Sequence, residues 1–257
     1  MIDAHAHLTD GRYSSARDVV EEFNAAGGEF VVDSGYDLKT SIAAADNAKN
    51  FPNVFFTCGF HPSEAAKYND LSALTKLCKD EKCLAVGEIG LDYHYPDHSK
   101  QAQKELFVAQ MRFAHEKRLP IVIHSRDCSA DMLDVLTANR ELLSDGFLMH
   151  CYSESREQAQ NYLALGAYFS FGGVITFKNA KKEEIIRGLP IDRLLTETDS
   201  PYLTPEPFRG TLNSPSKVAF VCKKMAEILG LTVGEVEDIT RRNFFAFYKK
   251  AAIYCNK

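Results

Sequence analysis

Two histidines near the start of the chain, His5 and His7, are spaced so that they can hold one metal ion together. They lie two residues apart in the run IDAHAHL (2–8), whose composition predicts a β-strand. Because side chains alternate along a strand with a period of two, both imidazoles should face the same side. The pair alone predicts little, since two histidines can also meet by chance at a strand end.

Further imidazoles and carboxylates fall at the carboxyl ends of other predicted strands, namely Glu88, His124, His150 and Asp199. In a barrel of parallel strands, that end carries the active site. Such groups are rarely buried without partners, and a shared set of divalent cations would supply partners for all of them. Imidazole and carboxylate ligands suit Zn²⁺, Mn²⁺ or Fe²⁺, and a bridging carboxylate with water ligands also allows Mg²⁺.

The acidic residues of this set have distinct expected roles. Glu88 lies at the end of a central strand and is followed by Gly90, so its carboxylate can give one oxygen to each of two metals. Glu197 and Asp199 share strand parity in TETDSP, which predicts that both face inward while Thr196 and Thr198 face the helical layer. We expect Asp199 to be a ligand and a proton acceptor. Glu197 would orient a histidine or a water, or else support the structure.

The elements that position these residues alternate between β-rich runs and amphipathic stretches. We count eight runs, near 2–8, 30–35, 54–59, 83–90, 121–125, 146–150, 167–172 and 194–200. This alternation over 257 residues matches an α/β fold of the (β/α)8 barrel type, although a doubly wound open sheet gives a similar pattern. Helices are expected near 215–229 and 233–250, the first as the eighth barrel helix and the second as a closing helix. One domain is expected over residues 1–257.

Composition narrows the possible partners and the compartment. The formal charge of −5 argues against sequence-independent binding to long nucleic acid through a basic surface, but does not exclude a nuclease. The seven cysteines are scattered without CxxC pairs, which predicts neither a disulfide framework nor a thiolate zinc site. No apolar run is long enough to span a bilayer, and the N-terminus lacks the pattern of a signal peptide, so a cytoplasmic protein is expected.

Three residues near the predicted rim are candidates for contacts around the metals or with the substrate. His61 follows the third strand in GFHP and would contact the substrate or a ligand, or be a simple loop residue. Arg126 and Arg209 carry guanidinium groups that fit two phosphate oxygens, although each could instead pair with an acidic neighbour.

Together the motifs resemble the TatD family of metal-dependent deoxyribonucleases over essentially the whole chain. They are DAHAHL (3–8), GFHP (59–62), GEIGLDY (87–93), IHSRD (123–127), MHCYS (149–153), FGGVITFKNA (171–180), LLTETDSPYL (194–203) and RGTLNSP (209–215). The resemblance implies a TIM barrel with magnesium-dependent deoxyribonuclease activity, often 3′ to 5′ exonucleolytic. It assigns His5, His7, Glu88 and Asp199 to a first ion, and Glu88, His124 and His150 to a second.

The chain departs from the family pattern at two positions. Thr9 stands before Asp10, where an Asp commonly follows HL directly, and Glu154 follows Ser153, where a Gly is frequent. The metal ligands are untouched, but the way in which phosphate or base is held beside Glu154 is left open, because a glycine there would let the backbone approach a ligand.

The expected function is two-metal cleavage of phosphodiester bonds in DNA ends or short single-stranded DNA by a monomer without an obligate protein partner. Two other functions fit the same residues. The site could hydrolyse a small amide, lactone or phosphoester, because fold and metals do not fix the substrate. The chain could also be a non-catalytic metal-binding protein, although the presence of the complete ligand set disfavours this.

Overall fold

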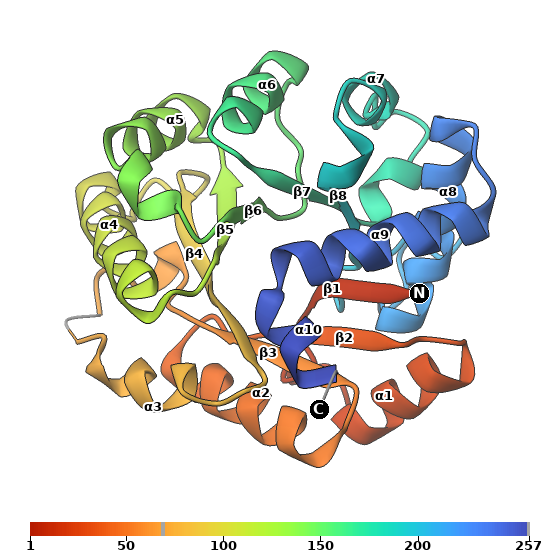
Figure 1. The fold of residues 1–257 in the computed structure, drawn as a ribbon, viewed down its shortest axis with the longest axis horizontal. Coiled ribbons are helices and arrows are strands. Elements are labelled where there is room, and N and C mark those ends of the chain that lie inside the picture. The colour runs from red at the N-terminus through yellow and green to blue at the C-terminus, as the bar shows by residue number, and fades with distance from the viewer. Residues whose placement is uncertain (68–69, 256–257) are drawn as a thin grey trace.

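The computed structural model describes residues 1–67 and 70–255. Eight parallel strands follow one another in chain order, each hydrogen-bonded to the next (Figure 1). They are β1 (Ile2–Ala6), β2 (Phe30–Ser34), β3 (Val54–Cys58), β4 (Cys83–Asp92), β5 (Ile121–Arg126), β6 (Phe147–Met149), β7 (Tyr168–Phe171) and β8 (Leu194–Thr196). The predicted (β/α)8 barrel is confirmed, because a doubly wound sheet would reverse its strand order partway.

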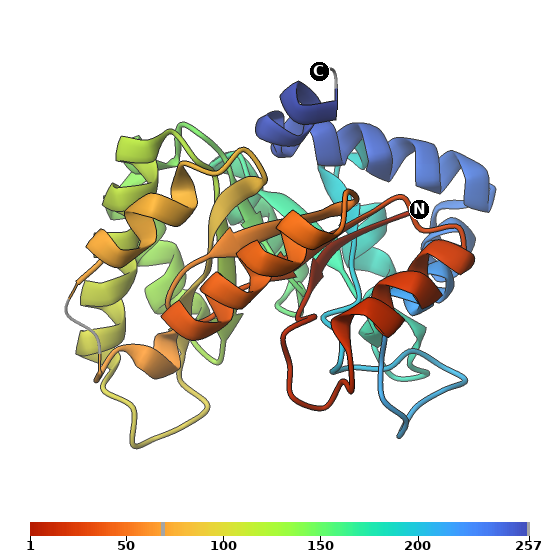
Figure 2. The same ribbon diagram turned by 90° about the horizontal axis from the view of Figure 1, so that it is seen from below.

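Helices surround the strands and close one end of the barrel. They are α1 (Ala16–Ala25), α2 (Leu38–Asn50), α3 (Thr75–Cys78), α4 (Lys100–Lys117), α5 (Ser129–Ala138), α6 (Arg156–Ala164), α7 (Glu183–Arg187), α8 (Val218–Leu229), α9 (Val233–Phe247) and α10 (Lys249–Cys255). Figure 2 shows α9 and α10 at one end of the barrel and long loops at the opposite end. None of the helices in the described part of the chain is long and apolar enough to cross a membrane.

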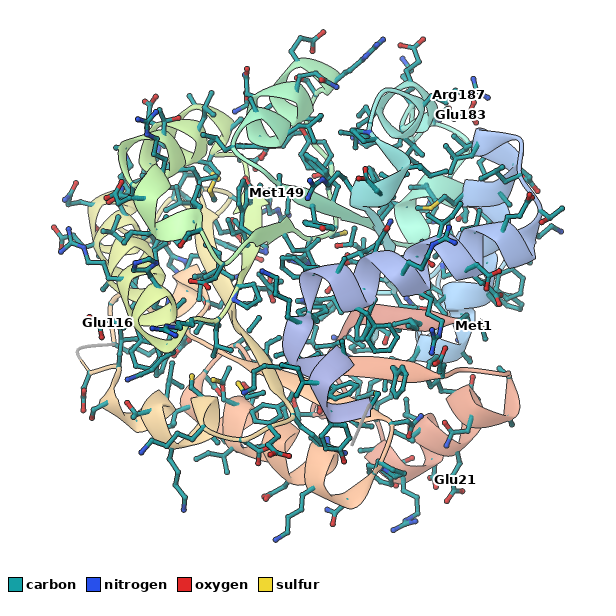
Figure 3. All side chains as sticks on the ribbon, viewed as in Figure 1. Met1, Glu21, Glu116, Met149, Glu183 and Arg187 are labelled. Atoms are coloured by element: carbon teal, nitrogen blue, oxygen red, sulfur yellow. The ribbon has the colours of Figure 1, made fainter. Side chains whose placement is uncertain are left out.

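Apolar side chains form an inner and an outer layer. The inner layer joins side chains near the strand starts, such as Ile2, Phe55 and Leu84, to Phe244 and Tyr248 from the C-terminal helices. A much larger outer layer fills the space between the strands and the surrounding helices. Charged side chains project from the periphery, as Glu21, Glu116 and Arg187 do in Figure 3. The amino-terminal end of the barrel is therefore sealed, and only the opposite end is free for a site.

The closing helix differs from the prediction of one helix over 233–250. A capping box of Thr232 and Glu235 starts α9, and such a cap stabilises a helix by about 1 kcal/mol. The helix ends at Phe247, because Tyr248 leaves helical geometry with a ψ of 70°. The Tyr248 ring is fully buried in the inner layer, and its hydroxyl donates to the Ala4 carbonyl at 3.4 Å. Burial of this ring at the barrel bottom redirects the chain into α10.

The barrel closes between β1 and the end of β8. The Thr196 hydroxyl donates to the Ile2 carbonyl at 3.1 Å, and beyond β8 the main chain continues the contact. There the Asp199 amide donates to the His5 carbonyl at 3.0 Å, and the His7 amide donates to the Ser200 carbonyl at 2.7 Å. The closure thus brings the first and last predicted ligand segments into direct main-chain contact.

Candidate metal centre

All six predicted ligands lie at the carboxyl-terminal end of the barrel and converge there. Their elements are β1 for His5, the residue after β1 for His7, β4 for Glu88, β5 for His124, and the segments just after β6 and β8 for His150 and Asp199. His5 is fully buried, whereas 19% of the His124 side chain and 15% of the Asp199 side chain are exposed. Five strand ends therefore contribute donor atoms to one shielded region.

His5, His7 and Asp199 form the first half of the site. The Nε2 atoms of the two histidines are 3.3 Å apart, and the Asp199 Oδ1 lies 3.7 Å from the first and 3.4 Å from the second. The His7 Nδ1 lies 2.8 Å from the Ser34 main-chain carbonyl, to which it must donate. The neutral His7 ring therefore presents its Nε2 lone pair to the site, as a metal ligand requires.

Glu88 lies between the two halves and faces each with a different oxygen. Its Oε1 is 2.7 Å from His124 Nδ1 and 2.8 Å from His150 Nε2. Its Oε2 is 3.7 Å from His5 Nε2 and 3.6 Å from His7 Nε2. A bridging ligand needs this arrangement, because each carboxylate oxygen can then coordinate a separate cation.

The charges of the site are strongly coupled. Burial disfavours the charged imidazole of His7, but the neighbouring Asp199 and Glu88 carboxylates outweigh it and raise the pKa of His7 to about 9. Burial alone would raise the pKa of the Glu88 carboxyl, but the surrounding imidazoles hold this pKa well below its usual range. For His150, too, the carboxylates overcome burial and raise the pKa. In the absence of metal, protons on the histidines thus balance the buried carboxylates.

Further polar groups orient the ligands from behind. The Asp92 Oδ2 lies 3.2 Å from His124 Nε2, and the Glu197 Oε1 lies 3.6 Å from His150 Nδ1. Asp92 was not among the predicted site residues. The sequence nevertheless contains a pattern that indicates Asp92. Glu88, Gly90 and Asp92 have the same parity in β4, and Asp92 ends the strand.

His61 lies beside the site through its contact with His124, since the two ring centroids are 4.5 Å apart. The Ser63 amide donates to the His61 Nδ1 at 3.1 Å, so the ring proton of the neutral form is on Nε2. Burial and the nearby His124 lower the pKa of His61 to about 4. The chain thus places a neutral hydrogen-bond donor next to the ligands.

The two predicted phosphate-binding arginines contact aromatic rings. Arg126 ends β5 exposed, with its guanidinium carbon 5.8 Å from the centroid of the Tyr95 ring. Arg209 is also exposed, and its guanidinium carbon lies 4.0 Å from the centroid of the Phe177 ring. Both residues line a pocket together with Lys178. Neither guanidinium forms an ion pair with a carboxylate in the described part of the chain, so the alternative of an acidic partner is not realised.

The alternation of side chains predicted for the last strand does not extend beyond Thr196. β8 ends at Thr196, and Asp199 has a positive φ of 53°, so strand alternation does not extend through TETDSP. Thr198 does not face a helical layer but donates to Asp3, a buried residue of β1. The pairing of β1 with β2 also shifts between Asp3 and Ala6, which shows that the strand is irregular just where His5 lies.

Glu154 and Asp10, at the two departures from the family pattern, make local contacts. Glu154 accepts hydrogen bonds from the hydroxyls of Ser125 and Tyr162. Asp10 accepts from the Arg12 side chain with both oxygens at 2.9 Å, and this partner lowers the pKa of Asp10 to about 2. Glu154 thus links the segment after β6 by a hydrogen bond to Ser125, the residue that follows His124.

The donor set fits divalent cations. Two overlapping groups, His5, His7 and Asp199, and His5, Glu88 and His150, each bring their nitrogen and oxygen atoms within 4.8 Å of one another. Glu197 is fully buried, yet neither of its oxygens accepts a hydrogen bond within the described chain. A buried carboxylate without hydrogen bonds is costly unless positive charge lies nearby, and within the described chain its ion-pair partner is His150, at 3.6 Å. The site therefore calls for cations, and its nitrogen and oxygen donors suit divalent metals.

Comparison with known proteins agrees with this chemistry. Residues 2–249 match the family described as TatD related DNase. The chain is 39% identical to the uncharacterized metal-dependent hydrolase YabD of Bacillus subtilis, over 95% of this chain and 96% of that protein. It is 37% identical to the uncharacterized metal-dependent hydrolase YcfH of Escherichia coli, with 95% and 94% covered. The crystal structure of the TatD homologue YJJV from Escherichia coli superposes with a TM-score of 0.91 at 27% identity, covering 97% of this chain and 98% of that one. The chain belongs to the TatD family of metal-dependent hydrolases.

Proposed function

We propose that this protein is a deoxyribonuclease that uses two divalent ions to cleave phosphodiester bonds, acting from 3′ ends. The observation that carries the proposal is the position of the Glu88 carboxylate, whose two oxygens face separate groups of histidines. Two cations bridged by a carboxylate are a recurring arrangement for in-line displacement at phosphorus. The TatD related DNase family supplies the substrate class.

His5, His7, Glu88 and Asp199 would hold the first ion, and Glu88, His124 and His150 the second. When bound, the ions supply Lewis-acid polarisation of the phosphate and lower the pKa of water. We propose Mg²⁺ as the activating metal, with Mn²⁺ and Zn²⁺ as the competing candidates that the nitrogen donors admit.

The protein residues would bind the substrate and move the proton. Asp199 is the more open of the two carboxylates between the histidines, with 15% of its side chain exposed against 6% for Glu88, so it can reach a water on the substrate side. Asp199 would accept the proton of the attacking water. Arg126 and Arg209, both exposed and without carboxylate partners in the described chain, are available to bind phosphate oxygens.

DNA ends or short single strands are the substrates that fit the charge of the molecule. With a net charge of −5, the protein offers little general attraction to long duplexes, so binding would depend on the local charge of the metals and the two arginines. We propose that the monomer acts on its own.

The test is cleavage of single-stranded DNA oligonucleotides labelled at the 5′ end, with the 3′ end either free or blocked. Chelation should abolish cleavage, and Mg²⁺, Mn²⁺ or Zn²⁺ added back singly should restore it to different extents. The free 3′ end should give a ladder of products, whereas a blocked end should give none. Internal cleavage of the blocked strand would contradict the exonuclease assignment.

Asp199→Asn distinguishes the protein from a contaminant. Loss of a general base typically costs about 10²- to 10⁴-fold in rate, so the variant purified in parallel should lose most cleavage. Undiminished cleavage by this variant would exclude Asp199 as the base or reveal a contaminating nuclease. A panel of small amides, lactones and phosphoesters tests the main alternative, and hydrolysis of these without DNA cleavage would overturn the nuclease proposal. Absence of any hydrolysis with metals bound would indicate a non-catalytic protein.

A further inference from the structure

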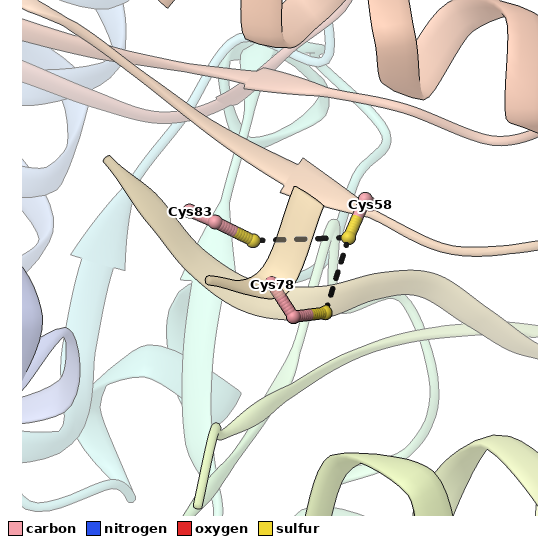
Figure 4. A group of neighbouring side chains, drawn as sticks. All are labelled: Cys58, Cys78 and Cys83. Atoms are coloured by element: carbon pink, nitrogen blue, oxygen red, sulfur yellow. Dashed lines mark hydrogen bonds between the residues drawn. The ribbon is translucent and has the colours of Figure 1, made fainter. Parts of the chain in front are cut away.

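Three buried cysteines from separate elements meet in the outer apolar layer between the strands and the surrounding helices. Cys58 ends β3, Cys78 ends α3, and Cys83 begins β4. The Cys58 Sγ lies 3.5 Å from the Cys78 Sγ and 3.7 Å from the Cys83 Sγ, as Figure 4 shows. Their spacing in the sequence does not predict a thiolate site, so only the fold reveals the cluster, here called the cysteine triad.

The triad has the dimensions of a thiolate metal site. All three sulfurs lie within 4.8 Å of one another. Three sulfurs that each lie about 2.3 Å from a shared ion are separated by about 3.8 to 4.0 Å, so small shifts would suffice. Cys58 and Cys83 are fully buried, and Cys78 is 7% exposed, which leaves one sulfur near the surface as the point of entry.

Positive charge lies beside the triad. Lys250 of α10 donates to the Asp80 carbonyl at 2.6 Å and lies 3.4 Å from the Cys78 carbonyl. Positive charge near a cysteine favours the thiolate, which is the form that binds metals.

We propose that Cys58, Cys78 and Cys83 together bind one Cu(I) ion as three sulfur ligands. Soft thiolates select Cu(I), Zn²⁺ or iron–sulfur clusters. Structural zinc takes four ligands and common iron–sulfur clusters take four cysteines, whereas this group contains three sulfurs and no imidazole or carboxylate among the described residues. Cu(I) accepts three-coordinate sulfur. On binding, the ion displaces the thiol protons to solvent, and no electron is transferred.

The site is independent of the divalent centre and of the proposed nuclease activity. The triad shares no residue with the histidine and carboxylate groups. The alternative is that the three thiols are simply small packing residues, since free cysteine is among the most buried residue types. Packing alone predicts neither stoichiometric binding of a soft ion nor a sulfur-only coordination shell.

The experiment presents Cu(I) under anaerobic, reducing conditions to the full-length protein already loaded with Mg²⁺, in competition with the chelator bicinchoninate. The wild type should withdraw one equivalent of Cu(I) from the chelator, and X-ray absorption should report three sulfur neighbours at about 2.3 Å. A first shell of nitrogen or oxygen, or no withdrawal of Cu(I), would overturn the proposal. The wild-type spectrum decides this without any variant.

Cys78→Ser and the matched control Cys222→Ser locate the ion. Cys222 is also buried but lies outside the triad, next to Thr196. The Cys78→Ser variant should bind Cu(I) at least tenfold more weakly, whereas Cys222→Ser should bind it as the wild type does, with thermal unfolding confirming that both are folded. Equal binding by Cys78→Ser would exclude the triad. A thiol count showing a Cys58–Cys78 disulfide in protein purified under reducing conditions would also overturn the proposal.

Discussion

The main-chain amide of Asp199 donates to the carbonyl oxygen of His5 at 3.0 Å, although 194 positions separate the two residues in the sequence. The same contact closes the barrel. It also holds the two side chains close together, so that His5 Nε2 lies 3.7 Å from Asp199 Oδ1. A change that loosens the β1 to β8 junction should therefore weaken the site as well as the fold. The catalytic end of this barrel depends on its closure.

Glu88→Gln should remove the bridge while preserving side-chain volume. The amide can present an oxygen to only one half of the site, and its NH₂ group repels a cation on the other. We expect the variant to retain fewer metal ions than the wild type after dialysis and to lose more than about 100-fold in activity, because even outer partners of ligands typically contribute 10- to 100-fold. Elemental analysis and DNA cleavage measure the two effects.

The matched control for that variant is Glu157→Gln, which changes the same functional group at an exposed position in the first turn of α6. It should retain wild-type metal content and cleavage. Retention of two ions by Glu88→Gln, with unchanged affinity, would show that the carboxylate does not bridge.

Metal binding should release the proton that His7 carries in the metal-free protein. In the metal-free protein the pKa of His7 is raised to about 9, so at pH 7 the incoming cation must displace this proton from Nε2. The apparent affinity should fall by at least about tenfold for each pH unit below 9, since one proton competes with the metal at 1.36 kcal/mol per unit. Above pH 9 the contribution of His7 should disappear, because this imidazole no longer carries a proton that the metal must displace.

Calorimetry in buffers with different ionisation enthalpies counts the released protons. His94→Gln is the control, since it removes an imidazole that is 47% exposed and pairs with the exposed Asp127. Its proton release should match that of the wild type. An affinity that stays constant between pH 6 and 9 would contradict the assignment of His7 as a ligand with a raised pKa.

The sequence predicted the barrel and the convergence of His5, His7, Glu88, His124, His150 and Asp199 by one physical rule, namely that the carboxyl ends of parallel strands share one edge. The rule needs only the order of the strands and the residue at each end. It therefore tolerated errors in the strand boundaries, such as the early end of β8 at Thr196.

The same rule could not predict contacts that depend on the exact path of the backbone. Thr198 was assigned by parity, which fails after β8 because Asp199 adopts a positive φ. In the cysteine triad, Cys58 lies 20 and 25 positions from the other two cysteines. The register of β3 with β4 places Cys83 opposite Phe56, two residues before Cys58, whereas Cys78 is brought in by α3. Asp92 could have been found, because it continues the parity of Glu88 within a single strand.

Asp92→Asn should weaken the second half of the site without removing a predicted ligand. The Asp92 carboxylate lies 3.2 Å from His124 Nε2, and it favours the tautomer that leaves Nδ1 free on the Glu88 side. We expect about 10- to 100-fold lower metal affinity or activity, as is usual for partners of metal-bound histidines. Asp127→Asn, which alters an exposed acid next to His94, should change neither. Equal metal affinity and cleavage in the two variants would exclude an orienting role for Asp92.

Glu154→Gly, which introduces the residue frequent at this position in the family pattern, should destabilise this protein. Glu154 accepts hydrogen bonds from the Ser125 and Tyr162 hydroxyls. Its loss would leave these partly buried donors with only the longer contacts to the Cys128 sulfur at 3.3 Å and the Ser129 carbonyl at 3.4 Å. Each such loss costs about 1 to 3 kcal/mol, and the added backbone freedom of glycine costs further free energy. For a chain of this size, the melting temperature should fall by about 2 to 10 °C.

Glu154→Gln separates the hydrogen bonds from the charge, because its amide oxygen can still accept from one of the two hydroxyls. Its melting temperature should lie between those of the glycine variant and the wild type. Because Ser125 directly follows His124, any loss of metal affinity in Glu154→Gly should accompany the loss of stability and recover in Glu154→Gln. A glycine variant as stable as the wild type would mean that the Ser125 and Tyr162 contacts contribute little, and that the acid at this position serves the substrate side instead.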